Sequence, residues 1–372
     1  MAFQSCFVTL VLLPFIGMPL GNHTLLLSFE GNLFAFGDNE EGQLGLGHND
    51  NPSLPSEVPW NGPQPVQVDW GWHHSLVLDA EGGVWEAGLS RLPSFSLHFT
   101  QVQELPGITL VAAGIHRSAA IDTEGGLWVW TSQRDLSWAS SLPHRVEVLP
   151  PLLKVACGLK FIAAETQEGT FWVLGNNSKG QLGLGHTNNA LQPTLIHLEE
   201  CSEGPLRCLA ACQNGVILID SQGGVFSTGD NSLGQLGRYS GSYSKLQRIE
   251  NIPPMLAASC GLNHTLSLDE NGDVWTWGHG AGGQLGRDIQ TSLHWPQPTQ
   301  VSSLKGMSSV VAGRGHSLVF AQEGSLLVFG CNDDGQLGVE SSENQTTPIP
   351  SHVKPALPHP FTRSRNKSAC FL

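Results

Sequence analysis

The sequence is poor in charge, and poorest in positive charge. Charged residues make up 13% of its 372 residues, and 18 Lys and Arg stand against 32 Asp and Glu, which gives a formal net charge of −14. A protein that binds DNA or RNA needs a basic surface to neutralise phosphates, so we expect no nucleic-acid partner. Residues 351–372 are the exception, because they hold four basic residues and no acidic one. We expect a flexible basic tail there.

Helical patterning and a cysteine framework are also missing. No useful length of chain has apolar residues at the 3.6-residue spacing of a helix. The eight cysteines include no Cys-x-x-Cys pair. Cys157, Cys212 and Cys260 lie in apolar runs, which is typical of reduced, buried thiols in a cytosolic or nuclear protein. A metal site built from Cys201, Cys208 and Cys212 would be poorly spaced.

What the sequence has instead is a sevenfold repeat. The repeated phrase is a Gly, a variable residue, an apolar residue, three more mostly apolar residues and usually a second Gly. Its copies begin at Gly31, Gly82, Gly125, Gly169, Gly223, Gly272 and Gly324, at spacings of 51, 43, 44, 54, 49 and 52 residues. A period near 50 residues over almost the whole chain predicts repeated supersecondary units.

Each unit is expected to be built from strands. A second apolar run precedes each phrase, and a short linker rich in Glu, Asn, Gln and Gly joins the two, as at residues 270–272. This pattern predicts a β-hairpin. Further upstream, small apolar residues such as those at 110–114 suit a crowded inner strand. Units of about four strands repeated around an axis form an all-β propeller, so we predict one seven-bladed domain over residues 20–350.

A Gly-Gln-Leu-Gly turn follows five of the seven phrases. Its glycines suit a tight turn that needs positive φ, and its leucine can tuck beneath the turn. The leucines expected to be buried in this way are Leu44, Leu182, Leu236, Leu285 and Leu337. The turn is absent after the second and third phrases, where the spacing is shortest. We therefore predict shorter loops and a lower rim in that sector.

A third motif, Gly-x-x-His followed by Ser or Thr, precedes the phrase. It is complete at residues 71–75, 261–265 and 313–317, and residues 20–24 keep its His but not its first Gly. The three motifs in this order resemble the regulator of chromosome condensation repeat family. That resemblance covers about residues 20–340 and implies a seven-bladed propeller. Arg117, Phe161 and Gly215 replace the His in the third, fourth and fifth units, so the middle of the ring departs from the pattern.

No catalytic constellation is found among these motifs. Four of the 15 histidines, His23, His74, His264 and His316, occupy one repeat position, which favours a structural hydrogen-bonding role over catalysis. The chain has no phosphate-binding loop, no Gly-x-Ser-x-Gly and no paired-His zinc helix. We therefore expect no enzyme activity, no cofactor and no metal.

Two functions of different classes remain open. The first is a protein-interaction propeller that acts as a scaffold or regulatory module. The second, implied by the family resemblance, is a guanine-nucleotide exchange factor for a small GTPase, which would need a complementary surface and no chemical group. Aromatic and basic residues outside the repeat motifs are the candidate partner contacts, because these residue types are common interaction hot spots. They are Trp70, Trp72, His73, Arg238, Tyr239 and Tyr243.

Residues 1–19 are mostly apolar and contain no charged side chain. This segment mimics the hydrophobic part of a secretory signal, but Pro14 and Pro19 interrupt it, and it has neither a basic start nor a small-x-small cleavage site. It is also too short and broken to span a bilayer. We expect residues 7–13 to supply an inner strand of a cytoplasmic or nuclear protein. The alternative is a secretion signal.

Overall fold

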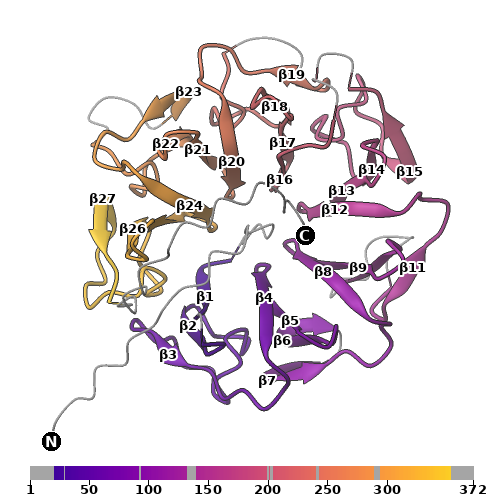
Figure 1. Cartoon of the computed structure of the whole chain (residues 1–372). Coiled ribbons are helices and arrows are strands. Elements are labelled where there is room, and N and C mark those ends of the chain that lie inside the picture. Colours follow the sequence, from indigo (N-terminus) through magenta and orange to yellow (C-terminus); the bar gives the residue numbers. More distant parts are fainter. Residues whose placement is uncertain are drawn as a thin grey trace, which may run out of the picture.

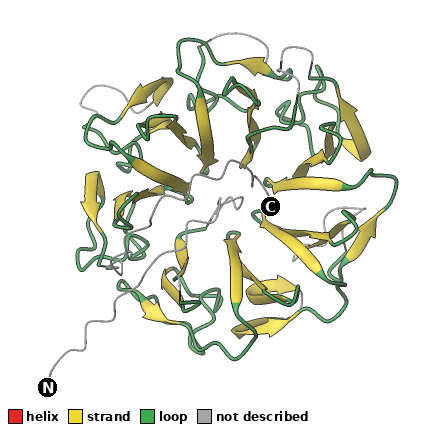
Figure 2. Cartoon of the chain, viewed as in Figure 1, coloured by secondary structure: helices red, strands yellow, loops and turns green. Residues whose placement is uncertain are grey.

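A computed structural model describes residues 21–28, 30–91, 94–131, 140–198, 201, 204–239, 243–288 and 294–352. In this part of the chain, seven antiparallel sheets surround one axis, each forming a blade (Figure 1). The regular structure described is strand only (Figure 2). The prediction of an all-β, seven-bladed propeller is therefore confirmed. The segment 1–19, with its expected strand at 7–13, and the tail 353–372 lie outside the described residues.

Blades are numbered in chain order, and in blades 2 to 7 the first strand is the innermost. Blade 1 holds β1 (His23–Leu27), β2 (Leu33–Gly37) and β3 (Ser56–Glu57); blade 2 holds β4 (Pro65–Trp70), β5 (His74–Asp79), β6 (Val84–Arg91) and β7 (Ser94–Gln101). Blade 3 holds β8 (Ile108–Ala113), β9 (Arg117–Asp122), β10 (Leu127–Thr131) and β11 (His144–Val146); blade 4 holds β12 (Leu152–Cys157), β13 (Phe161–Thr166), β14 (Phe171–Gly175) and β15 (Ala190–Ile196).

The remaining three blades repeat this order. Blade 5 holds β16 (Cys208–Cys212), β17 (Gly215–Ile219), β18 (Val225–Gly229) and β19 (Gln247–Arg248); blade 6 holds β20 (Met255–Cys260), β21 (His264–Asp269), β22 (Val274–His279) and β23 (His294–Gln300); blade 7 holds β24 (Met307–Ala312), β25 (His316–Ala321), β26 (Leu326–Gly330) and β27 (Gln345–Pro350). The repeated phrase supplies the third strand of blades 2 to 7 and β2 of blade 1.

The core lies between neighbouring blades. Val155 and Ala164 of blade 4, for example, share one cluster with Ala112, Ala119 and Leu127 of blade 3. The inner strands are rich in small residues, as in β8 and β16, because the inner strands of neighbouring blades converge on the axis (Figure 1). Burial between blades explains why both faces of a strand such as β5 are closed to solvent.

The Gly-Gln-Leu-Gly turns connect the third and fourth strands of blades 4 to 7, and β2 to β3 in blade 1. Blade 2 lacks the turn: β6 runs into β7 through a tight connection in which Arg91 pairs with Ser94. In blade 3, residues 132–139 between β10 and β11 lie outside the described residues. Blades 2 and 3 are therefore the turn-less members of the ring.

Candidate protein-interaction site

The recurring histidines lie at the boundaries between blades. Each is fully buried, and its Nε2 atom lies 3.0–3.1 Å from a hydroxyl oxygen of the following blade. The pairs are His23 with Ser75, His74 with Ser118, His264 with Ser317 and His316 with Thr24. The last pair joins blade 7 to blade 1, so it closes the ring.

The hydroxyl partners show which histidine nitrogen carries the proton. Ser75 donates its own hydrogen to the Gln43 carbonyl at 2.7 Å, so it accepts a bond from His23 Nε2–H. Ser317 does the same between the Gln284 carbonyl and His264. The imidazoles are thus neutral bridges. Burial lowers the pKa of His74, His264 and His316 to about 3, and that of His23 well below its usual value.

The turn leucines are all buried. Leu44, Leu182, Leu236, Leu285 and Leu337 have exposed fractions of 0%. An asparagine that the sequence motifs did not include holds four of these turns: Asn177 accepts a hydrogen bond from the Leu182 amide at 2.9 Å. Asn39, Asn231 and Asn332 do the same in their blades. In the sequence, this asparagine belongs to a Gly-x-Asn motif at the end of the repeated phrase. The motif occurs in four of the seven copies.

Two predicted partner contacts are corrected by their burial. Trp70 ends the inner strand β4 and is 1% exposed, within the core shared by blades 7, 1 and 2. Arg238 is 8% exposed, and its guanidinium donates to Ser227 and Gln247 of its own blade. A side chain buried in this way packs within the ring and is not accessible to a partner protein. Sequence alone does not distinguish such residues from exposed ones of the same type.

Trp72 and His73 lie in a different setting, in the loop between β4 and β5. Their rings stack at a centroid distance of 5.4 Å, and His116 of blade 3 stacks on Trp72 at 6.2 Å. The Arg314 guanidinium of blade 7 lies 4.4 Å from the Trp72 ring centre. We name Trp72, His73, His116 and Arg314 the axial cluster. All four side chains are half-buried.

The axial cluster comes together because backbone hydrogen bonds join the inner loops of neighbouring blades. The Trp72 amide donates to the Ile115 carbonyl of blade 3, and the Arg314 amide donates to the Gly21 carbonyl of blade 1. A Cβ atom on Gly21 would lie 2.4 Å from the Gly71 carbonyl oxygen, so the glycine lets the inner loops of blades 1 and 2 approach closely. His116 and Arg314 were not among the predicted contacts. They occupy the two variable positions of Gly-x-x-His, which the fold brings to the same end of the axis.

Carboxylates border the axial cluster on the side of blades 7 and 1. They are Asp38, Glu40, Glu41, Asp333 and Asp334, which we name the acidic crescent. Burial raises the pKa of Asp334, and repulsion from Asp333 and Glu40 adds to the effect, while a 2.9 Å hydrogen bond from Asn22 opposes it. Burial also lowers the pKa of His73, and Arg314 acts in the same direction. The site therefore combines crowded carboxylates with the Trp72 ring and the Arg314 guanidinium.

The remaining candidates, Tyr239 and Tyr243, are surface residues of blade 5. Tyr239 is 66% exposed and Tyr243 is 38% exposed. The Arg238 guanidinium lies 5.2 Å from the Tyr243 ring centre. Residues 240–242 between them lie outside the described part of the chain. These tyrosines are thus separate from the axial cluster of blades 2, 3 and 7.

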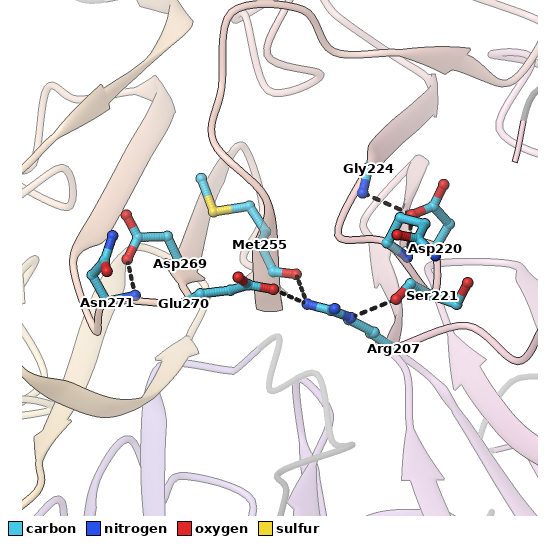
Figure 3. Close-up of polar contacts among 9 residues, drawn as sticks. Arg207, Asp220, Ser221, Gly224, Met255, Asp269, Glu270 and Asn271 are labelled. Atoms are coloured by element: carbon cyan, nitrogen blue, oxygen red, sulfur yellow. Dashed lines mark hydrogen bonds and ion pairs between the residues drawn. The ribbon is translucent and has the colours of Figure 1, made fainter. Parts of the chain in front are cut away.

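Other polar contacts on the ring serve to join blades. Arg207, just before β16, donates to the Ser221 carbonyl at 2.9 Å and to the Glu270 carboxylate of blade 6 at 2.7 Å (Figure 3).

Within the residues that the structure describes, no group of three His, Cys, Asp or Glu is placed to hold a metal ion. No helix in the same residues is long and apolar enough to cross a membrane.

Comparison with protein families matches this chain to the model described as "Regulator of chromosome condensation (RCC1) repeat". The matched residues are 30–78, 222–268, 271–320 and 323–363, and a second model of the same description matches 257–284 and 307–336. Residues 79–221 lie outside these matches. That stretch contains β6 and β7 of blade 2, all of blades 3 and 4, and β16 and β17 of blade 5.

Two curated relatives are similar over about half of the chain. A human probable E3 ubiquitin-protein ligase, HERC3, is 34% identical over 54% of this chain and 19% of its own length. A mouse secretion-regulating guanine nucleotide exchange factor is 34% identical over 52% of this chain and 42% of its own length. The chain thus spans less than half the length of either relative.

Solved structures share the fold. Human WBSCR16 superposes with a TM-score of 0.76 at 20% identity, over 86% of this chain and 93% of that one. Prp20p from Saccharomyces cerevisiae, described with its binding properties to Gsp1p and histones, superposes with a TM-score of 0.76 at 20% identity, over 90% of this chain and 87% of that one. At such identity the likeness concerns architecture alone.

Proposed function

The chain belongs to the regulator of chromosome condensation repeat family, and from that premise we propose that it is a non-catalytic propeller that binds protein partners as a scaffold or regulatory module. The observation that supports this proposal is that two groups of polar residues differ in their burial. The repeated His, Ser, Asn and Gln side chains are buried and bonded within the ring, whereas the non-repeated residues of the axial cluster and acidic crescent are open to solvent in part.

The axial cluster has the composition of an interaction hot spot. Trp and Arg are the residue types that most often dominate binding energy, particularly where neighbouring groups exclude water. Trp72 is held between Arg314 and two imidazoles, so little side-chain entropy is lost on binding. We propose the axial cluster as the partner contact, with the acidic crescent favouring basic surfaces and increasing the association rate.

The test is affinity capture followed by quantitative binding. The full chain captures partners from cell extract, and each partner is then purified and titrated against wild type, Trp72→Ala and Tyr239→Ala. We expect Trp72→Ala to weaken binding by at least about tenfold, the loss of one aromatic hot spot. Tyr239→Ala is the matched control, an exposed aromatic outside the cluster. If Trp72→Ala binds every partner as tightly as wild type does, the axial cluster is the wrong site.

Exchange activity on a small GTPase is the second candidate function. The similarity to the mouse secretion-regulating exchange factor favours it. The measurement is release of a fluorescent nucleotide from a panel of small GTPases, together with capture in the presence and absence of EDTA. Strong acceleration on one GTPase, and capture of that GTPase only when EDTA removes Mg²⁺, would replace the scaffold proposal with exchange.

We propose the cytoplasm or nucleus as the compartment. The free thiols Cys157, Cys212 and Cys260 support this proposal, since they are buried in core positions and burial raises the pKa of Cys157 to about 12. Such unreactive thiols suit a reducing environment. Imaging of the chain tagged at its C-terminus tests the compartment. Recovery from the medium in a form shortened at the N-terminus would show that residues 1–19 act as a secretion signal.

A further inference from the structure

Two of the Gly-Gln-Leu-Gly turns, those of blades 5 and 6, are followed directly by an arginine. In blade 5 this residue is Arg238, which is 8% exposed and bonded through three nitrogen atoms. Its Nε and Nη2 atoms donate to Ser227, and its Nη1 atom donates to the Gln247 side chain at 2.9 Å. The counterpart in blade 6 is Arg287, which is half-buried. The two arginines share a sequence context, so their partners can be compared directly.

Arg287 lacks most of these partners because the facing residues differ. In blade 5 the register pairs Ser227 with Gln247, and in blade 6 the equivalent pair is Thr276 and Thr299. Both threonine hydroxyls donate to carbonyl groups of their own blade. Among the described residues, Arg287 Nε is buried without a hydrogen-bond partner, and Nη2 makes a long bond of 3.5 Å to the Thr276 carbonyl.

No ion pair joins Arg287 to a carboxylate in the described part of the chain. Burial lowers the pKa of its guanidinium. A cation that is half-buried and unpaired costs free energy in a folded protein. This chain has 32 acidic residues against 18 basic ones, so an internal partner would be easy to supply. Its absence beside Arg287 points to a ligand from outside the ring.

Trp295 of the outer strand β23 holds the guanidinium by one face. The Arg287 Cζ atom lies 4.8 Å from the Trp295 ring centre. The turn of blade 5 packs closely on this strand, since a Cβ atom on Gly234 would lie 2.8 Å from the Pro296 Cα. Because one face is stacked and Nε is buried, the end with Nη1 and Nη2 is the part that can bind. That end can donate two parallel hydrogen bonds to a planar oxyanion.

The charge of this site fits a carboxylate better than a phosphate. One guanidinium carries a single positive charge, whereas a phosphorylated side chain carries about −1.5 to −2 at pH 7. His279 and His294 occupy the neighbouring pair of the same two strands, with ring centres 5.7 Å apart. Burial lowers the pKa of His279, and the His294 imidazole adds to the effect, so His279 supplies no second positive charge at pH 7.

We propose that Arg287 and Trp295 form a second contact site, on the outer part of blade 6, that receives an Asp or Glu side chain of a partner protein. This inference rests on the proposed protein-binding function. The carboxylate accepts hydrogen bonds from Nη1 and Nη2 of Arg287, and so takes the place that Gln247 has beside Arg238 in blade 5. The site is distinct from the axial cluster, whose acidic crescent favours basic groups.

The first test asks whether Arg287 serves the fold. Arg238→Met should lower the urea midpoint, because it leaves Ser227 and Gln247 without their donor. Arg287→Met should keep the midpoint or raise it, because the substitution removes a buried Nε that has no acceptor. A midpoint that falls as far in Arg287→Met as in Arg238→Met would overturn the proposal, since the guanidinium would then be structural.

The second test titrates a carboxylate into the site. The probe is N-acetyl-glutamate N-methylamide, added to full-length protein labelled with ¹⁵N-arginine, and the glutamine analogue is its neutral control. We expect the Arg287 Nε–H signal, assigned by its loss in Arg287→Met, to shift with the glutamate probe alone. Arg248, an exposed arginine of β19, reports non-specific binding. Equal shifts at Arg248, or no shift at Arg287, would overturn the proposal. A larger response to the phosphoserine analogue would refute the choice of a carboxylate.

The third test uses the protein partners captured by the full chain. Each partner is titrated against wild type, Arg287→Gln and Arg287→Lys, and Arg248→Gln is the control that removes the same charge. We expect Arg287→Gln to weaken binding by about tenfold, through loss of a hydrogen-bonded ion pair. Arg287→Lys should weaken it as well, because an ammonium group has no planar fork. If partners that depend on Trp72 bind Arg287→Gln as tightly as wild type, this inference fails while the proposed function stands.

Discussion

At the scale of single residues, equivalent positions in the seven blades carry different side chains with different consequences. The position that holds His in four blades holds Arg117 in blade 3, Phe161 in blade 4 and Gly215 in blade 5. Phe161 and Arg117 are as buried as the histidines, so the position stays enclosed in blades 3 and 4. The position is structural in all blades, and the variable residues beside it are free to form the axial cluster.

Val148 offers a direct test of strain at one residue. It occupies the same place in the linker after blade 3 as Asn251 does after blade 5, where φ is +58°. Asn tolerates this region far better than Val. We expect Val148→Asn to raise the free energy of unfolding by roughly 1 kcal/mol, measured by urea denaturation. Asn251→Val should lower it by a similar amount. Loss of stability in Val148→Asn would show that the valine side chain packs within the ring.

At the scale of elements, the Gly-Gln-Leu-Gly turn connects a hairpin and also covers the next blade. Leu182 fills the space beneath the turn with an exposed fraction of 0%, while Asn177 fixes the backbone above it. Gly183 has a φ of +71°, where a side chain is strained. The turn therefore contributes to two blades at once.

The turn's contribution can be measured by truncating its leucine. Leu182→Ala and Leu285→Ala should each lower the free energy of unfolding by about 2–4 kcal/mol, as for buried leucines elsewhere. Gly183→Val should also destabilise, because valine is strained at positive φ. Leu191→Ala is the matched control, and as an exposed residue it should change stability by less than about 0.5 kcal/mol. Unchanged urea midpoints for the three turn variants would refute the packed-turn account.

At the scale of the whole molecule, the ring is closed by a contact between a buried imidazole and a hydroxyl group. The same contact joins three other pairs of neighbouring blades. Thr24 lies between the His316 imidazole and the Gln336 carbonyl, as Ser317 lies between His264 and Gln284. Closure leaves no free blade edge at the junction of blades 7 and 1. It also makes the stability of the ring depend on four imidazoles that must stay neutral.

The neutral imidazoles predict a loss of stability in acid. Their folded pKa values lie below the unfolded value of about 6.5, so the unfolded chain binds more protons as the pH falls. Stability is complete above pH 6.5 and declines toward pH 3, by about 1.4 kcal/mol per pH unit for each histidine. Urea denaturation at pH 7 and pH 5 should show this decline.

A variant that copies another blade isolates one histidine. His264→Phe installs the residue that blade 4 has at this position, Phe161. We expect it to remove about a quarter of the pH dependence between pH 7 and pH 5, since one of four buried imidazoles is gone. An unchanged slope would mean that the His264 imidazole does not contribute to the loss of stability in acid.

The sequence by itself determined the number of blades, the strand that each phrase forms and the burial of the turn leucines. These follow from local spacing, because a glycine turn and a strand depend on residues close together in the chain. Only the tertiary structure decided that Trp70 and Arg238 are enclosed and that Trp72 meets His116 and Arg314. The physical reason is that exposure and contact depend on neighbouring blades, which lie about 50 residues away or, for Arg314, across the closure of the ring.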